Sequence, residues 1–168
     1  MAETNKLKSI PGKVKEEQFK REIQNFAYGR VLPQANELEE AVLGAIMVDK
    51  DGLPSVNSIL RPDSFYVEAH KIIFEHMEDL FKNSQPVDLL TVHEALRKSK
   101  KLEEIGGINF LMQVANKVAS AANIEYHARI VAQKFVQREL IKVSSFTIKD
   151  AFEDTKDVFD MLDEAEKN

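Results

Sequence analysis

The chain has 168 residues, of which 43% are hydrophobic and 30% charged, with a net charge of −5. This length suits one domain, or one domain with an appendage, that buries a core of its own. The net negative charge argues against a domain that binds nucleic acid over its whole surface. The absence of cysteine excludes disulfides, thiolate zinc sites and a cysteine nucleophile, and the six Gly and five Pro are too few for an all-β fold rich in tight turns.

The two ends of the chain differ in charge. Residues 1–30 hold seven Lys and Arg against four Asp and Glu, a net of +3, whereas residues 151–168 hold two against seven, a net of −5. We interpret residues 1–31 as a flexible polar tail; contact of its basic residues with phosphates is the alternative. No apolar run approaches the roughly 20 residues that span a bilayer, and the start of the chain lacks a signal-peptide core. We therefore expect a cytoplasmic protein with no membrane partner.

Organised sequence begins near residue 32. Asn36 is predicted to cap the first helix, with Glu39 as the reciprocal capping-box acid. An apolar stripe then runs from Leu38 to Met47 at helical spacing. A second, short helix is expected over residues 53–60.

The third and fourth helices have clear boundary signals. Asp63 or Ser64 is predicted to cap the third helix, and Pro86 forbids its continuation. Asp88 is predicted to cap the fourth, whose basic last turn suits the helix dipole. Inward-facing side chains are predicted at Ile72, Ile73, Met77, Leu80 and Phe81 in the third helix and at Val92 and Leu96 in the fourth.

A Gly-Gly pair at residues 106–107 precedes the fifth helix. A phosphate loop is disfavoured here because "KKLEEIGG" is acidic and no Lys follows, and the chain has neither G-x-x-x-x-G-K-[ST] nor G-x-G-x-x-G. We expect a helix start with close backbone packing. The buried stripe of this helix is predicted to be Phe110, Leu111, Val114 and Val118.

The last third of the chain is predicted to form a helical hairpin. Residues 121 to about 152 contain no Gly or Pro, which predicts a helix of about 30 residues, and a second apolar pattern starts at Val158. The predicted fold is all-α: a compact multi-helix head over residues 32–120, followed by a projecting C-terminal hairpin over residues 121–168 with its second helix truncated. A projecting hairpin cannot bury its own stripe, so self-association is expected. The candidate contacts are Val131, Phe135, Phe159 and Leu162.

The residues offer no catalytic constellation. The histidines at 70, 76, 93 and 127 form no E-x-x-H pair of the kind that di-metal bundles use. The acidic run "FEHMED" cannot aim all its side chains at one ion, because adjacent helical residues diverge by about 100°. Ser144 and Ser145 lack a base and elbow glycines. We expect a non-catalytic chain without a cofactor or a metal.

The order of five blocks is distinctive: "LPQANELEEAVLGAIMVD", "FYVEAHKIIFEHMEDLF", "PVDLLTVHEAL", "LEEIGGINFLMQVA" and "SAANIEYHARIVAQKFVQRELI". In a single register from residue 32 onward, they resemble the N-terminal domain of the bacterial replicative DNA helicase, the DnaB family. The resemblance implies a homohexamer that encircles single-stranded DNA and unwinds it 5′ to 3′. A RecA-like motor domain, expected beyond Asn168, would bind ATP and Mg²⁺. The N-terminal domains would form a trimer-of-dimers collar that docks the C-terminal domain of primase and a helicase loader.

Three residues match the primase-facing surface of the family. These candidates are Glu37 in "NELEEAVLG", Phe110 in "GGINFL" and Ile141 in "RELIKV". Each has a structural alternative, namely the helix dipole for Glu37, the core for Phe110 and hairpin pairing for Ile141. The turn "SSFTIKDAFEDTKD" departs from the family pattern, so no role is carried beyond Val143.

Two other classes of protein stay open. A stand-alone helical adaptor without a motor would lack a Walker A lysine downstream of this chain. A metal-dependent bundle enzyme would retain stoichiometric metal on purification, and we expect none.

Overall fold

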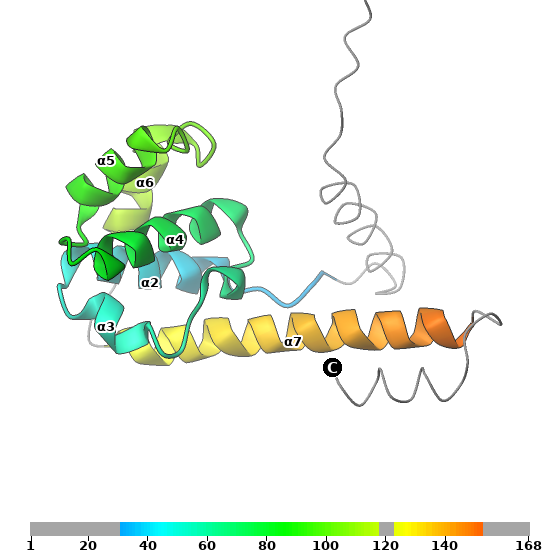
Figure 1. Cartoon of the computed structure of the whole chain (residues 1–168). Helices are drawn as coiled ribbons and strands as arrows, with labels where there is room; N and C mark the ends of the chain where they lie inside the picture. Colours follow the sequence, from blue (N-terminus) through cyan, green and yellow to red (C-terminus); the bar gives the residue numbers. More distant parts are fainter. Residues whose placement is uncertain (1–30, 118–122, 153–168) are drawn as a thin grey trace, which may run out of the picture. The chain divides into compact units, whose positions relative to one another are not determined.

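The computed structural model describes residues 31–117 and 123–152, and every regular element within these ranges is helical (Figure 1). The all-α prediction is therefore confirmed. No helix among the described residues is long and apolar enough to cross a bilayer. The elements in chain order are α2 (Asn36–Val48), α3 (Gly52–Val56), the 3-10 turn η1 (Pro62–Ser64), α4 (Glu68–Lys82), α5 (Leu89–Lys98), α6 (Gly107–Asn116) and α7 (Ile124–Ala151).

The chain divides into two compact units. The first, which we call the head, is Pro33–Gln137, and the second includes residues 138–152. The division falls within α7, so the first half of that helix belongs to the head. Most of the predicted tail, residues 1–30, and the predicted second hairpin helix lie outside the described residues.

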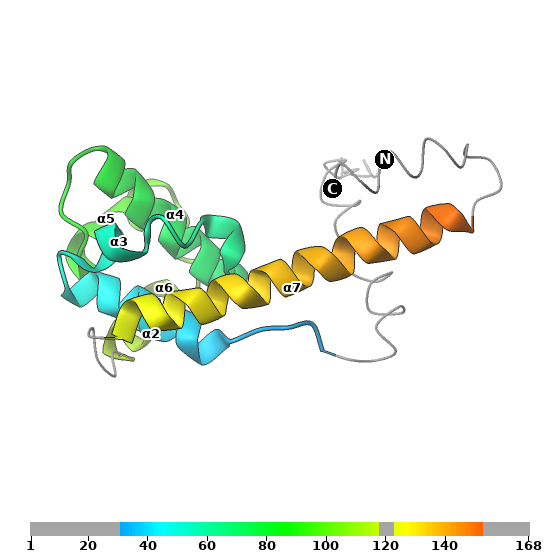
Figure 2. The same cartoon turned by 90° about the horizontal axis from the view of Figure 1, so that it is seen from below.

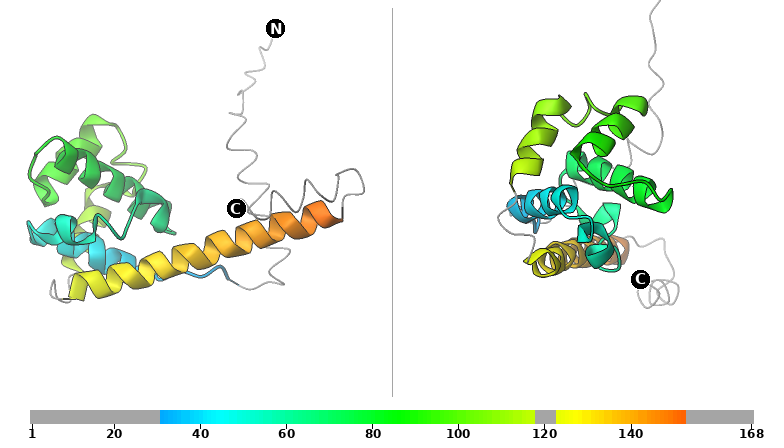
Figure 3. Two further views of the ribbon diagram at one scale, coloured as in Figure 1. Left: turned by 60° about the horizontal axis from the view of Figure 1, so that its bottom comes forward. Right: turned by 90° about the vertical axis from the view of Figure 1, so that its left-hand side faces the viewer.

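Helix α2 lies at the centre of the head. It contacts α3, α4 and α6, and α5 packs on both α4 and α6 (Figure 3). The first turns of α7 cross beneath α2 and complete the same core (Figure 2). Full burial of one large apolar side chain stabilises a fold by about 1.5–3 kcal/mol. The largest apolar side chains that are fully buried here are Phe74, Leu43, Ile46, Leu53, Ile73, Met77, Leu96 and Leu111.

The start of α5 follows the sequence prediction. The Asp88 carboxylate accepts hydrogen bonds from the backbone N–H groups of Leu90 and Thr91, both at 2.9 Å, and the Thr91 hydroxyl accepts one from the Asp88 N–H at 2.9 Å. These reciprocal bonds satisfy donors that a helix end otherwise leaves unpaired. Val92 and Leu96 are fully buried, as predicted.

The predicted caps of α2 and α4 are wrong. The residue that precedes α2 is Ala35, and no side chain caps this helix. Helix α4 starts after Val67, again without a side-chain cap, while Asp63 and Ser64 lie in η1. The physical reason is that Glu39 turns inward and binds the backbone at the start of α4, as described below.

Two further features differ from prediction, namely the end of α3 and the burial of Phe81. Helix α3 ends at Val56, and Ile59 and Leu60 continue as turns whose N–H groups donate to the Val56 carbonyl at 2.8 and 2.9 Å. Phe81 was predicted to be buried but is 42% exposed, because it lies in the last turn of α4, just before the chain reverses at Ser84. In α6, Leu111 and Val114 are buried as predicted, whereas Val118 lies outside the described residues.

Candidate functional site

A buried hydrogen bond between Glu39 and His70 joins α2 to α4 inside the head. The Nδ1 atom of His70 lies 2.8 Å from Oε2 of Glu39, and both residues are 1% exposed. The same carboxylate accepts hydrogen bonds from the backbone N–H groups of Tyr66 at 2.8 Å and Val67 at 3.3 Å. Since a carboxylate only accepts, Nδ1 carries the proton that it donates to Glu39. One side chain of α2 therefore binds the backbone of the two residues that precede α4, 27 residues or more away along the sequence.

Phe110 lies directly against this pair. Its ring stacks on the His70 imidazole, with centroids 5.9 Å apart and planes 13° from parallel. The ring is half-buried and lines an open groove of about 370 Å³ together with Glu40, Gln113, Val114, Asn116 and Lys117. An ion pair of 3.3 Å between Glu40 and Lys117 joins α2 to the residue that follows α6. Phe110 is thus supported from within the head and open to a partner at its rim.

The Gly-Gly pair starts α6 and shows no phosphate cradle. Gly106 and Gly107 have φ angles of 102° and 77°, which only glycine adopts without strain. Their N–H groups donate to the carbonyls of Glu103 at 3.2 Å and Leu102 at 2.9 Å, so neither points at a ligand. The predicted helix start with close packing is confirmed, because a Cβ on Gly106 would lie 3.2 Å from the Cβ of Phe110.

Of the three primase-facing candidates, the structure brings two toward one surface. Glu37 is exposed in the first turn of α2, three residues before Glu40, and residues at this spacing share a helix face. Glu37 therefore flanks the groove that Phe110 and Glu40 line. Ile141 lies in the second unit, half-buried, with its carbonyl accepting a hydrogen bond from the Ser145 hydroxyl at 2.7 Å.

The self-association candidates occupy different environments. Val131 is 1% exposed in the core of the head, so its burial needs no second copy. Phe135 is half-buried, with the Arg61 guanidinium 4.6 Å above its ring. Phe159 and Leu162 lie outside the described residues.

Other side chains of α7 are apolar and exposed. Val136 is 54% exposed and Leu140 62% exposed, and Val143 follows them at helical spacing. Counting about 100° per residue, these three lie roughly 120° around the helix from the face that Ile124 and Val131 bury. The apolar face of α7 thus changes along its length, so no single stripe runs through the helix.

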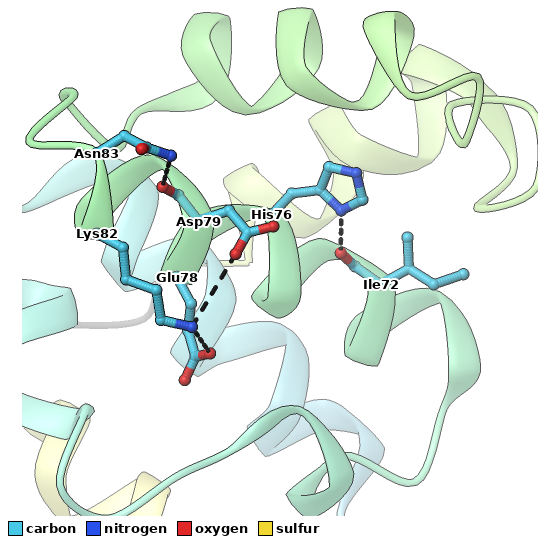
Figure 4. Close-up of polar contacts among 6 residues, drawn as sticks. All are labelled: Ile72, His76, Glu78, Asp79, Lys82 and Asn83. Carbon is cyan, nitrogen blue, oxygen red and sulfur yellow. Dashed lines mark hydrogen bonds and ion pairs between the residues drawn. The ribbon is translucent and has the colours of Figure 1, made fainter.

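The C-terminal half of α4 carries polar contacts rather than a metal site (Figure 4). His76 Nδ1 donates to the Ile72 carbonyl at 2.8 Å, and Lys82 Nζ donates to Glu78 at 2.9 Å. That hydrogen bond to Glu78 raises the pKa of Lys82. Across residues 31–117 and 123–152, no group of three or more His, Cys, Asp or Glu side chains could hold a metal ion.

Sequence reasoning missed the buried hydrogen bond between Glu39 and His70. A signal was present in the sequence. Glu39 lies at helical spacing from Leu43 and Ile46, and α2 buries all three residues. His70 falls in phase with Ile73, Phe74 and Met77 of α4 in the same way. An acid and a histidine that each lie in a buried stripe are expected to pair, because buried charges need partners.

The fold and the site define an all-helical domain that has exposed apolar side chains and an open groove on its surface. Residues 31–133 match the family model described as the DnaB-like helicase N terminal domain, and the chain belongs to that family. The family expectation drawn from the five sequence blocks is confirmed.

Two curated relatives show how much of a longer protein this chain represents. The chain is 45% identical over 138 residues to the replicative DNA helicase DnaB of Rhodothermus marinus and 42% identical over 138 residues to that of Geobacillus stearothermophilus. Each match covers 82% of this chain but only 15% and 30%, respectively, of the relative.

Two solved structures share the fold. The N-terminal domain of DnaB helicase from Mycobacterium tuberculosis matches with a TM-score of 0.75 at 31% identity, covering 81% of this chain and 96% of that one. A structure of a DnaB-like replicative helicase, described together with its interactions with primase, matches with a TM-score of 0.66 at 27% identity, covering 79% of this chain and 31% of that one.

Proposed function

We propose that this chain serves as the collar domain of a replicative DNA helicase, in which it assembles the ring and docks primase. The observation that carries the proposal is the match to a solved DnaB N-terminal domain over 96% of that domain. The described residues offer interaction surfaces, namely the Phe110 groove and the exposed apolar side chains of α7. DNA unwinding, 5′ to 3′ and driven by ATP with Mg²⁺, is the work of a RecA-like motor domain in the same protein.

Primase docking is supported by the character of the groove around Phe110. An aromatic side chain that is packed at its base and open at its rim is the kind of residue that anchors an interface. Glu40 at the groove is paired with Lys117, whereas Glu37 is exposed three residues earlier on α2 and suits a partner surface that presents Lys or Arg. A solved helicase with the same fold is described together with its interactions with primase, which supports primase as the partner proposed here.

The docking proposal is tested by calorimetric titration of the chain with the C-terminal domain of primase from the same organism. Phe110→Ala should weaken binding by more than about 1 kcal/mol, which is the usual threshold for an anchor residue. Phe81→Ala is the matched control, because Phe81 is an exposed aromatic of the head on another helix. Equal affinities of the two variants would remove Phe110 from the interface.

Self-association is supported by the apolar face of α7, on which Val136 and Leu140 are exposed and Val143 is half-buried. An apolar row of this kind in water favours pairing with a second copy. Sedimentation should show a dimer or a larger species, and Leu140→Asp should shift it toward the monomer. Leu90→Asp is the control, since Leu90 is equally apolar and exposed but lies on α5. A wild-type chain that stays strictly monomeric at high concentration would refute this part of the proposal.

The wider assignments follow from the family. We place the protein in the cytoplasm as a homohexamer, a trimer of dimers, that encircles single-stranded DNA and receives a loader. A Walker A lysine downstream of residue 168 would separate this function from that of a stand-alone adaptor.

A further inference from the structure

The Glu39–His70 pair fills the core and also fixes the orientation of a side chain, which an ordinary apolar contact would not do. A buried polar pair stabilises a fold only weakly, because both groups lose their hydration when the chain folds. Apolar residues at these two positions would match the rest of the stripe on α2 and α4. The pair instead directs three N–H groups onto one carboxylate, which fixes the orientation of the imidazole ring.

The fixed imidazole is a platform for Phe110. Its Nε2 atom is buried and has no hydrogen-bond partner among the described residues, so no polar contact holds that edge of the ring. The nearly parallel stacking at 5.9 Å is an offset arrangement of the kind that aromatic rings favour. The orientation of Phe110 therefore depends on the orientation of His70.

The backbone of Gly106 lies against the base of the Phe110 side chain. A Cβ at Gly106 would lie only 3.2 Å from the Cβ of Phe110, so the glycine backbone approaches this side chain closely. Gly106 lies beside the Cβ of Phe110 and the imidazole stacks on its ring, and these two contacts restrict the rotamers of the side chain. Its rim then forms one wall of the groove that Glu40, Gln113 and Lys117 also line.

We propose that Glu39 and His70 are positioning residues for partner docking, which hold Phe110 in the orientation that a primase side chain meets in the groove. The inference rests on the proposed docking function. Holding an interface side chain in its bound rotamer before association removes an entropic loss that binding would otherwise incur. Glu39 and His70 are both 1% exposed, so they act on the partner only through Phe110.

The test uses His70→Gln and Glu39→Gln in the full chain. In His70→Gln the new amide retains a donor for Glu39 but the ring that supports Phe110 is gone, and Glu39→Gln keeps the side-chain shape while removing the charge. With ¹³C-labelled phenylalanine, the Phe110 ring signals should shift in both variants, whereas those of Phe81 should stay in place. Affinity for the primase C-terminal domain should fall about two- to tenfold, as expected for one side chain that binding must order, with helix content unchanged by circular dichroism.

The outcomes separate the inference from the function on which it rests. Unmoved Phe110 signals in both variants, or unchanged affinity in both while Phe110→Ala binds weakly, would overturn the positioning role and leave docking intact. Unchanged affinity in Phe110→Ala would refute the docking site and the inference together. Should His70→Gln fail to fold, Glu39→Gln carries the same two readouts.

Discussion

Truncation of Glu39 should destabilise the head more than any other removal of a charge from α2. Glu39→Ala deletes the shared acceptor of Tyr66 N–H at 2.8 Å, Val67 N–H at 3.3 Å and His70 Nδ1–H at 2.8 Å. Each buried donor left without a partner costs about 1–3 kcal/mol, and Glu39→Ala leaves all three of these donors without their acceptor. We expect a loss of about 3–5 kcal/mol, because the costs of neighbouring groups overlap and do not add.

A loss of that size is measurable and has a matched control. Stabilities of small domains are about 5–15 kcal/mol, so the midpoint of urea unfolding, followed by circular dichroism, should fall steeply for Glu39→Ala. Glu37→Ala removes an acid two residues earlier on the same helix, where it is exposed and interacts with the helix dipole, and should cost less than about 1 kcal/mol. A loss below about 1 kcal/mol for Glu39→Ala would show that the Glu39–His70 pair contributes little to the stability of the head.

Three further predictions concern local features of the head. Gly52→Ala should cost about 1–3 kcal/mol in urea unfolding, since a Cβ there would lie 3.0 Å from the Ile46 Cα, and backbone must move; a neutral result would contradict that close approach. Asp88→Ala should cost about 1 kcal/mol through loss of the α5 cap, and unaltered thermal unfolding would place the cap energy elsewhere. The hydrogen bond from Arg97 lowers the pKa of Glu94 from 4.5, so Glu94 stabilises the fold at neutral pH and ceases to do so as pH falls through that lowered pKa. Glu94→Gln should therefore melt earlier than wild type at pH 7, and the gap between the two melting temperatures should narrow as the pH falls below 4.5; a constant gap would contradict the linkage.

Local sequence signals predicted the parts of the fold that local interactions determine. The Asp88 cap and the buried Val92 and Leu96 depend on residues within two or three turns of one another, and they were predicted correctly. Phe81 followed the same periodicity yet is exposed, because periodicity identifies a helix face but not where the covering elements end.

The candidate site was only partly accessible from the sequence. Phe110 could be proposed from resemblance, and the structure adds why its ring is held in place. The role of Glu39 was missed because an acid near a helix start is the usual sign of a cap, and its true partners lie 27 to 31 residues away. Partners at that separation are specified by tertiary packing, which a single-sequence pattern does not resolve.

Helix α7 is a second element that the sequence pattern described incompletely, because its apolar residues form two faces and not one. Apolar residues recur along the whole helix, and the sequence suggested one continuous stripe. The structure shows that Ile124, Ala128 and Val131 are buried in the head, while Val136 and Leu140 point elsewhere. A helix that serves two different partners along its length carries two faces out of phase, so candidates chosen from a single stripe, such as Val131, can prove to be core.

Hydrogen exchange of the chain, with and without the primase C-terminal domain, tests the central claim most directly. Bound primase should slow exchange in the first turns of α2, near Glu37 and Glu40, and in α6 around Phe110. Exchange in the last turn of α4, around Phe81, should be unchanged. Protection confined to α4 and α5, or no protection at saturating primase, would contradict docking at this groove.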